Sequence, residues 1–103
     1  MLELHKNQYP SLKKWINELK EFQLDSIFET SVLGRSYLYV DQVKDFDILD
    51  QMITGKVSGT EEYKMTITSE KDSIWGTCTC KHDQKCKHLA ALLLACIQQQ
   101  TPE

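Results

Sequence analysis

One stretch of the chain reads Cys78-Thr79-Cys80-Lys81-His82-Asp83-Gln84-Lys85-Cys86-Lys87-His88. Its pattern is Cys-x-Cys, five residues, and then Cys-x-His. Thiolate and imidazole groups are the ligands that zinc prefers, and four of them in a tetrahedral arrangement make a closed structural site. We therefore predict one structural zinc ion, bound by Cys78, Cys80, Cys86 and His88.

The residues that flank this stretch indicate how the four ligands meet. Side chains two residues apart on a strand point to the same face, so Cys78 and Cys80 project together if they end a strand. Cys86 and His88 stand at the start of an Ala-rich segment, where the dipole of a helix favours thiolates. The apolar positions of that segment recur at helical spacing, in Leu89, Leu92, Leu93 and Cys96. One ion would then fasten the last strand to the last helix.

Other roles for these residues are weaker. His82 extends the two-residue series from Cys80 and is the rival ligand, although an exposed turn histidine is the simpler interpretation. Cys96 lies on the apolar side of the expected helix and is interpreted as a small core residue. A disulfide is disfavoured because a Cys-x-Cys bridge is strained and any longer pairing gives His88 no role.

The lysines near the zinc stretch have two interpretations. Three thiolates around Zn²⁺ leave a net negative charge, which Lys81, Lys85 and Lys87 would offset. Alternatively, these lysines contact a phosphate backbone or an acidic partner, together with Lys71 and with Trp75 stacked on a base. The spacing of the residues leaves both interpretations open.

Upstream, periodicity changes from helical to extended. Leu12, Trp15, Ile16 and Leu19 predict an amphipathic helix. The sequence Ser26-Ile27-Phe28-Glu29 matches a capping box and predicts a second, short helix that Gly34 ends. Period-two alternation then begins at Tyr37 and predicts three or four antiparallel strands across residues 37–80.

These segments predict one α+β domain over residues 1–103. Its parts are N-terminal helices (1–34), a small antiparallel β-meander (35–80), and a zinc knuckle with a C-terminal helix (78–98). The net charge of −3 has the wrong sign to indicate a nucleic-acid binder. No apolar run reaches the roughly 18 residues of a membrane span, and the first residues lack a signal-peptide core, so we expect a cytoplasmic protein without a membrane partner.

The zinc stretch resembles the SWIM zinc finger, whose signature is Cys-x-Cys, a variable spacer, and Cys-x-His before a helix of small residues. Here the signature is Cys78-x-Cys80 followed by Cys86-x-His88-Leu89-Ala90-Ala91. The likeness covers about residues 33–96 and includes Gly34-Arg35-Ser36-Tyr37, Val57-Ser58-Gly59 and Tyr63-x-Met65. The five-residue spacer is at the short end of the family's range and leaves little room for an inserted recognition loop.

The resemblance implies a zinc-stabilised module that accompanies Swi/Snf helicase-like ATPases or Mutator-type transposases and binds protein or DNA. No ATPase motif occurs in these 103 residues, so we expect a non-catalytic accessory domain that contacts a protein partner or a neighbouring domain. Nucleic-acid binding through the lysines is the alternative. A zinc enzyme is disfavoured because four ligands close the shell and Asp83 is the only acidic residue between them.

Overall fold

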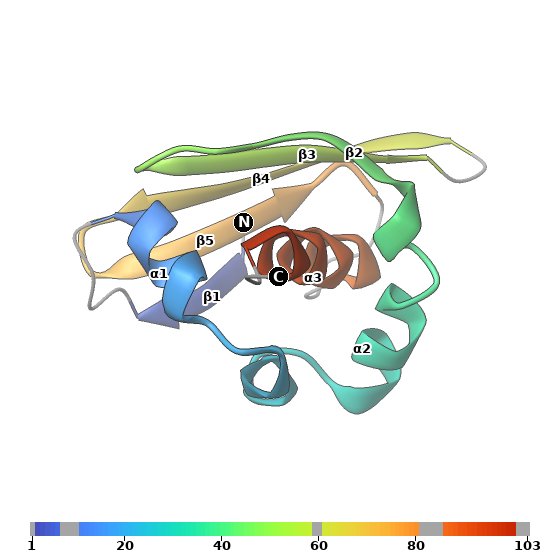
Figure 1. Cartoon of the computed structure of the whole chain (residues 1–103), viewed down its shortest axis with the longest axis horizontal. Helices are drawn as coiled ribbons and strands as arrows, with labels where there is room; N and C mark the ends of the chain where they lie inside the picture. The colour runs from blue at the N-terminus through green and yellow to red at the C-terminus, as the bar shows by residue number, and fades with distance from the viewer. Residues whose placement is uncertain (1, 7–10, 59–60, 81–85, 101–103) are drawn as a thin grey trace.

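The framework of the protein is a five-stranded antiparallel sheet in the order β1-β5-β4-β3-β2 (Figure 1). The computed structural model describes residues 2–6, 11–58, 61–80 and 86–100. The strands are β1 (Leu2–Lys6), β2 (Val43–Ile48), β3 (Met52–Ser58), β4 (Glu62–Glu70) and β5 (Ser73–Cys78). Strands β2 to β5 form the predicted meander, whereas β1, which the sequence did not indicate, pairs with the free edge of β5.

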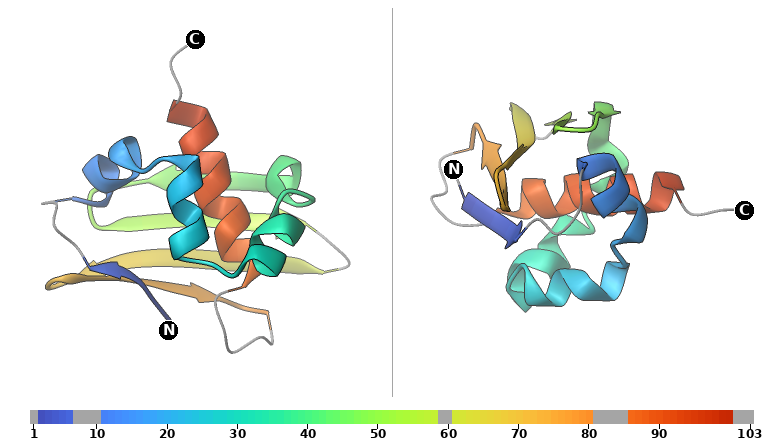
Figure 2. Two further views of the ribbon diagram at one scale, coloured as in Figure 1. Left: turned by 90° about the horizontal axis from the view of Figure 1, so that it is seen from below. Right: turned by 90° about the vertical axis from the view of Figure 1, so that its left-hand side faces the viewer.

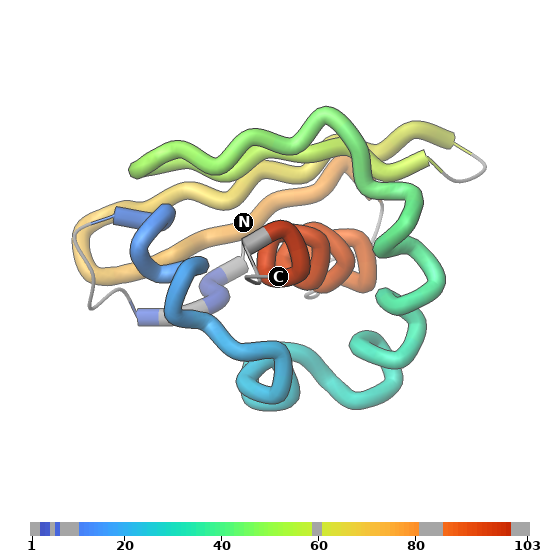
Figure 3. Tube along the Cα trace, in the orientation of Figure 1, coloured from blue at the N-terminus to red at the C-terminus, as the bar shows by residue number. Residues whose placement is uncertain are grey.

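The described helices lie on one face of this sheet (Figure 2). They are α1 (Leu12–Glu18), the 3₁₀ turn η1 (Glu21–Ser26), α2 (Thr30–Ser36), the 3₁₀ turn η2 (Val40–Gln42) and α3 (Lys87–Gln100). The trace runs from α1 through η1 and α2 past α3 and returns to the sheet at η2 (Figure 3). Helix α3 is therefore enclosed between the sheet and the N-terminal helical segments.

This enclosure explains the composition of α3. The four predicted apolar positions, Leu89, Leu92, Leu93 and Cys96, are all buried. The intervening Ala90, Ala91 and Leu94 are buried as well. A helix that is apolar on every side must be covered on every side, because an apolar group left in water does not contribute the favourable free energy of burial. The sheet covers one side of α3, and α1, η1 and α2 contact it from the other.

Alternation along the central strands assigns one face of the sheet to this core. Ile53 and Val57 of β3, Ile67 of β4 and Ile74 of β5 are buried, whereas their immediate neighbours are partly or fully exposed. Gly55 lies in the same buried series. A Cβ added to it would stand 2.6 Å from Leu92 Cδ1 of α3. This glycine therefore sets how closely α3 approaches the sheet.

The predicted N-terminal helix is confirmed. It is α1, whose Leu12, Trp15 and Ile16 are buried, and Ser11 caps it by accepting a hydrogen bond from the Lys14 N–H at 3.1 Å. Leu19, which follows the helix, is buried too.

The predicted boundaries of the second helix are wrong. Ser26 ends the 3₁₀ turn η1, and its hydroxyl donates to the Gln23 carbonyl instead of capping a helix. The helix α2 begins only after Glu29 and continues through Gly34 to Ser36. A glycine can end a helix by adopting a left-handed conformation, but no described glycine has a positive φ.

The first predicted strand is also wrong, because residues 37–42 form turns. The N–H groups of Leu38, Tyr39 and Gln42 each donate to the carbonyl three residues earlier. These local hydrogen bonds form in place of strand pairing, although aromatic and aliphatic residues alternate here. The tertiary contacts favour the turns, because the Tyr37 hydroxyl donates to Glu21 of η1 and the Tyr39 ring contacts His88 of α3. The meander consequently starts at Val43.

The packing predicts opposite effects for two glycine substitutions. Gly55→Ala should lower the free energy of unfolding by about 1–3 kcal/mol, because the new methyl group displaces the fully buried Leu92. Gly34→Ala is the matched control, since a Cβ there meets no atom within 4 Å and lies on an exposed part of α2. That variant should be neutral or more stable by up to about 1 kcal/mol. Urea unfolding of both variants measures the difference, and equal effects would contradict this account of the packing.

Candidate metal centre

Four predicted ligands come together at one end of the molecule. Cys78 ends β5, Cys80 follows two residues later, and Cys86 and His88 lie at the start of α3. Their ligand atoms all lie within 4.8 Å of one another, and we call these four residues the Cys3His cluster. The predicted grouping is therefore present, and among the described residues it is the one group of this kind suited to a metal ion.

The spacing of the cluster fits a tetrahedral zinc site. Zn–S bonds of about 2.3 Å and Zn–N bonds of about 2.0–2.1 Å separate two tetrahedral ligand atoms by about 3.6–3.8 Å. Cys78 Sγ lies 3.6 Å from His88 Nδ1. The widest pair, at up to 4.8 Å, needs to close by only about 1 Å to share one ion. The short contact identifies Nδ1 as the ring nitrogen of His88 that faces the thiols.

The Cys-x-Cys half of the cluster is fixed by the sheet. Cys78 pairs with Met65 of β4, a buried residue, so its side chain belongs to the face that α3 covers. Thr79, between the two cysteines, bonds to Lys64 in both directions. Its N–H donates to the Lys64 carbonyl at 3.0 Å, and its hydroxyl accepts from the Lys64 N–H at 3.0 Å. Pairing with β4 thus continues one residue beyond β5 and orients the backbone at the first two ligands.

The Cys-x-His half is fixed by the first turn of α3. The Cys86 carbonyl accepts the hydrogen bond of the Ala90 N–H at 3.2 Å, so Cys86 stands at the helix N-terminus as predicted. Cys86 is 5% exposed and His88 is 3% exposed. A buried imidazole and a buried thiol need partners, and the cluster provides them for each other.

The thiols of the cluster share protons unequally. A hydrogen bond from the Cys78 thiol lowers the pKa of Cys86 to about 4, against the opposing effect of burial; His88 and the Leu89 backbone lower it further. The hydrogen bond to Cys86, followed by burial, raises the pKa of Cys78. One thiolate is therefore already stabilised at neutral pH. Cys78 must release its proton when a metal ion binds, so metal binding is coupled to proton release.

Two tyrosines that the sequence did not identify as part of the site hold His88. Tyr63 of β4 stacks on the imidazole, with ring centroids 4.5 Å apart and planes 20° from parallel. Tyr39, just before η2, meets the same ring edge-on at 5.3 Å. Lys87 Nζ in turn lies 5.1 Å from the centre of the Tyr39 ring. These contacts fix the orientation of the histidine ring, a role that no local sequence pattern signals.

The other predicted contact residues differ in where they lie relative to the cluster. Lys81 and Lys85, with the rival ligand His82 and with Asp83, lie outside the described residues. Lys71 is in the β4–β5 turn, at the opposite end of β5 from Cys78, and Trp75 lies between them on that strand. Of the predicted lysines, Lys87 is the one that the structure places beside the cluster.

Cys96 behaves as the predicted core residue. It is fully buried in α3, two turns beyond His88, and burial raises the pKa of its thiol to about 12. A thiol with that pKa remains protonated at neutral pH and is neither a ligand nor a reactive nucleophile.

Comparison with known protein families, characterised proteins and solved structures finds no match to this chain. None of the helices in the described ranges is long and apolar enough to cross a membrane.

The cluster predicts one zinc ion per chain. Cys86→Ser and His88→Ala should each lower the bound zinc well below one equivalent, because a three-ligand site that has lost a buried thiolate or imidazole binds more weakly. Cys96→Ala is the control, since Cys96 is outside the cluster, and it should retain full zinc. Elemental analysis of dialysed protein gives the metal content directly. Equal zinc in Cys86→Ser and in the unsubstituted chain would contradict the assignment.

The stacked tyrosine should tune zinc affinity without supplying a ligand. Tyr63→Ala removes the ring that holds His88 and should weaken zinc binding by about 10- to 100-fold, the usual effect of losing a group that orients a ligand. Tyr63→Phe keeps the stacked ring and should bind zinc as tightly as the unsubstituted chain. Competition with a chromophoric chelator measures both affinities. An equal loss in the two variants would place the effect in the hydroxyl rather than in the stack.

Proposed function

We propose that this chain is a non-catalytic, zinc-stabilised interaction module of the SWIM type. The observation that supports it is the Cys3His cluster, which unites the end of β5 with the start of α3 in the order that the SWIM signature requires. A structural zinc contributes on the order of 10 kcal/mol or more to folding, enough to decide whether a domain of this size folds. The ion in this proposal is a scaffold.

The ligand chemistry favours a structural role for the ion over a catalytic one. Catalytic zinc sites in general keep three protein ligands and an open position for water. Here four soft or borderline ligands converge, and two of them, Cys86 and His88, are almost fully buried. A filled and buried coordination shell gives a substrate no place to bind. The bound thiolates are equally unsuited to redox cycling.

A protein partner or a neighbouring domain is the favoured contact. Phe22 of η1 is 74% exposed and Leu38, after α2, is 72% exposed. Large apolar side chains are unfavourable in contact with water, and covering them with a partner stabilises the complex. Both lie on the helical side of the molecule, among the segments that enclose α3. By its SWIM-like signature, the parent assembly would be a helicase-like ATPase of the Swi/Snf type, to which this module is an accessory.

Binding of nucleic acid is the second candidate. Lys87, beside the cluster, supports it, as do Lys81 and Lys85 by sequence. The surroundings of Lys71 do not support nucleic-acid binding. Lys71 lies in a shallow hollow at the β4–β5 turn, which Trp75 also lines, and Glu70 and Asp72 flank it there. Two carboxylates next to one ammonium group weaken any attraction for phosphate. The net charge of −3 acts in the same direction.

Titration with fluorescent single- and double-stranded DNA at low and high salt separates the two candidates. The protein-interaction module should bind neither DNA even at low ionic strength, since its net charge repels phosphate. The second candidate would be favoured if DNA binds at low salt and the affinity falls steeply as salt rises. In that case Lys87→Gln should also weaken DNA binding more than Lys13→Gln does. Lys13 is exposed on α1 and serves as the matched control.

A further inference from the structure

The face of the sheet opposite α3 carries no described helix (Figure 2). We call it the outer face. Three of its strands contribute alternate residues that pair directly across the sheet, as their register shows. They are Met52, Thr54, Lys56 and Ser58 of β3, Glu62, Lys64, Thr66, Thr68 and Glu70 of β4, and Ser73, Trp75 and Thr77 of β5. This surface is mostly polar, but it is not uniform in charge.

Lysines gather at one end of the outer face. Lys44 of β2, Lys56 of β3 and Lys64 of β4 are direct cross-strand neighbours in register. Like charges in such a row destabilise a sheet. Glu62 offsets one of them by pairing with Lys44 at 3.3 Å. Within the described ranges no carboxylate forms an ion pair with Lys64, although its side chain is exposed.

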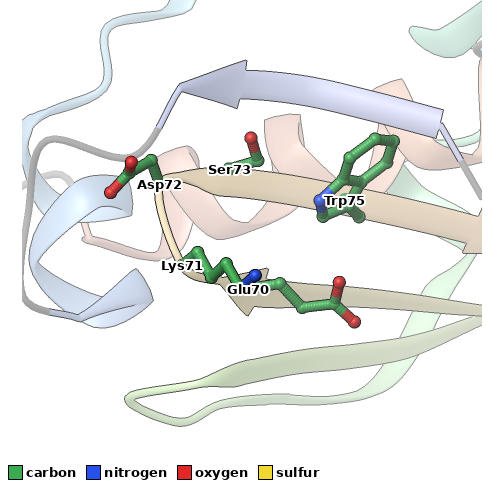
Figure 4. Close-up of a pocket in the computed structure, with 5 residues that line it drawn as sticks. All are labelled: Glu70, Lys71, Asp72, Ser73 and Trp75. Carbon is green, nitrogen blue, oxygen red and sulfur yellow. The ribbon is translucent and has the colours of Figure 1, made fainter.

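Carboxylates and an indole gather at the other end. Glu70 ends β4, and with Lys71, Asp72, Ser73 and Trp75 it lines a shallow hollow at the β4–β5 turn. Figure 4 looks onto this face, with α3 behind the sheet, and shows the side chains of Glu70 and Trp75 on either side of the hollow.

A further carboxylate lies beside the hollow. Glu3 of β1 is the cross-strand neighbour of Trp75, and its carboxylate accepts the hydrogen bond of the Ser73 hydroxyl at 2.6 Å. The hollow thus offers an aromatic wall and carboxylate groups at its rim, which suits a cationic side chain.

The central strand makes the two ends complementary to each other. Along β4 the outer residues read Lys64, Thr66, Thr68 and Glu70. A two-fold axis that crosses the strand between Thr66 and Thr68 places Lys64 of one copy opposite Glu70 of a second copy, and Thr66 opposite Thr68. A two-fold interface requires this kind of self-complementarity, in which residue i meets residue j twice.

The neighbouring strands obey the same axis. Met52 pairs with Thr68 and Thr54 with Thr66, so on β3 the axis sets Met52 of one copy against Thr54 of the other. On β5, Trp75 pairs with Thr68 and Thr77 with Thr66, so Trp75 would pack on Thr77. Met52 and Trp75 then meet threonine side chains, while Lys64 meets Glu70.

We infer that the outer face binds a second copy of this chain, with Lys64 entering the hollow formed by Glu70 and Trp75. Five strands spaced about 4.8 Å apart, over six residues of β4 at about 3.4 Å each, give a face of roughly 500 Å² per copy. That is below the roughly 800 Å² per partner of a stable complex. The dimer is therefore weak and reversible. It does not depend on the zinc assignment.

Charge exchange between two variants tests this dimer. In the full chain, Lys64→Glu places carboxylates opposite each other twice, and Glu70→Lys does the same with ammonium groups, so each variant alone should dimerise at least about tenfold more weakly. An equal mixture of the two should recover dimers, because each Lys64→Glu chain still carries Glu70 and faces a chain with the reverse pattern. Sedimentation equilibrium from about 10 μM to 1 mM covers the affinity expected of an interface this small.

Lys13→Glu and Glu18→Lys on α1 make the same changes in net charge away from the outer face and should dimerise as the unsubstituted chain does. Circular dichroism reports whether each variant is folded. Should Lys64→Glu fold poorly, Glu70→Lys carries the test alone, since it sets a lysine opposite Lys64. A monomer at every concentration, lone variants that dimerise normally, or a mixture that stays monomeric would each overturn the proposal.

Discussion

The contact between Cys78 and His88 is the one on which the rest of the structure depends. It joins the end of the sheet to the start of the helix that the whole molecule surrounds. Helix α3 is apolar on every side, so it is stable only while both the sheet and the N-terminal segments cover it. The contact at its first turn fixes the position of α3 relative to β5, and the core extends along the length of the helix.

The aromatic contacts extend this constraint to two more parts of the chain. Tyr63 brings β4 to the imidazole and Tyr39 brings the segment between α2 and η2 to it. The cluster therefore gathers four separate stretches of the chain. Loss of the ligands would release the sheet end, the helix start and the turn at η2 together, which is the behaviour expected of a small domain whose core alone gives a modest stability margin.

The sequence predicted what depends on spacing and missed what depends on distant contacts. The grouping of the four Cys and His residues and the apolar side of α3 follow from fixed intervals between residues, and the structure contains both. The prediction of a strand at residues 37–42 was wrong because Tyr39 packs against His88 and does not pair in the sheet. Strand β1 could not be recognised from five residues, since its partner lies about 70 positions away. The self-complementary outer face required the register, which no single strand contains.

Strand β1 also sets an order of events during synthesis. It is synthesised before the other described strands, yet the strand that it pairs with is made roughly 70 residues later, as the bond between Glu3 and Ser73 illustrates. Closing so long a loop is entropically costly, whereas the β2–β5 meander needs only short turns. The β1 segment of the nascent chain must therefore stay unpaired until the edge of β5 has been made.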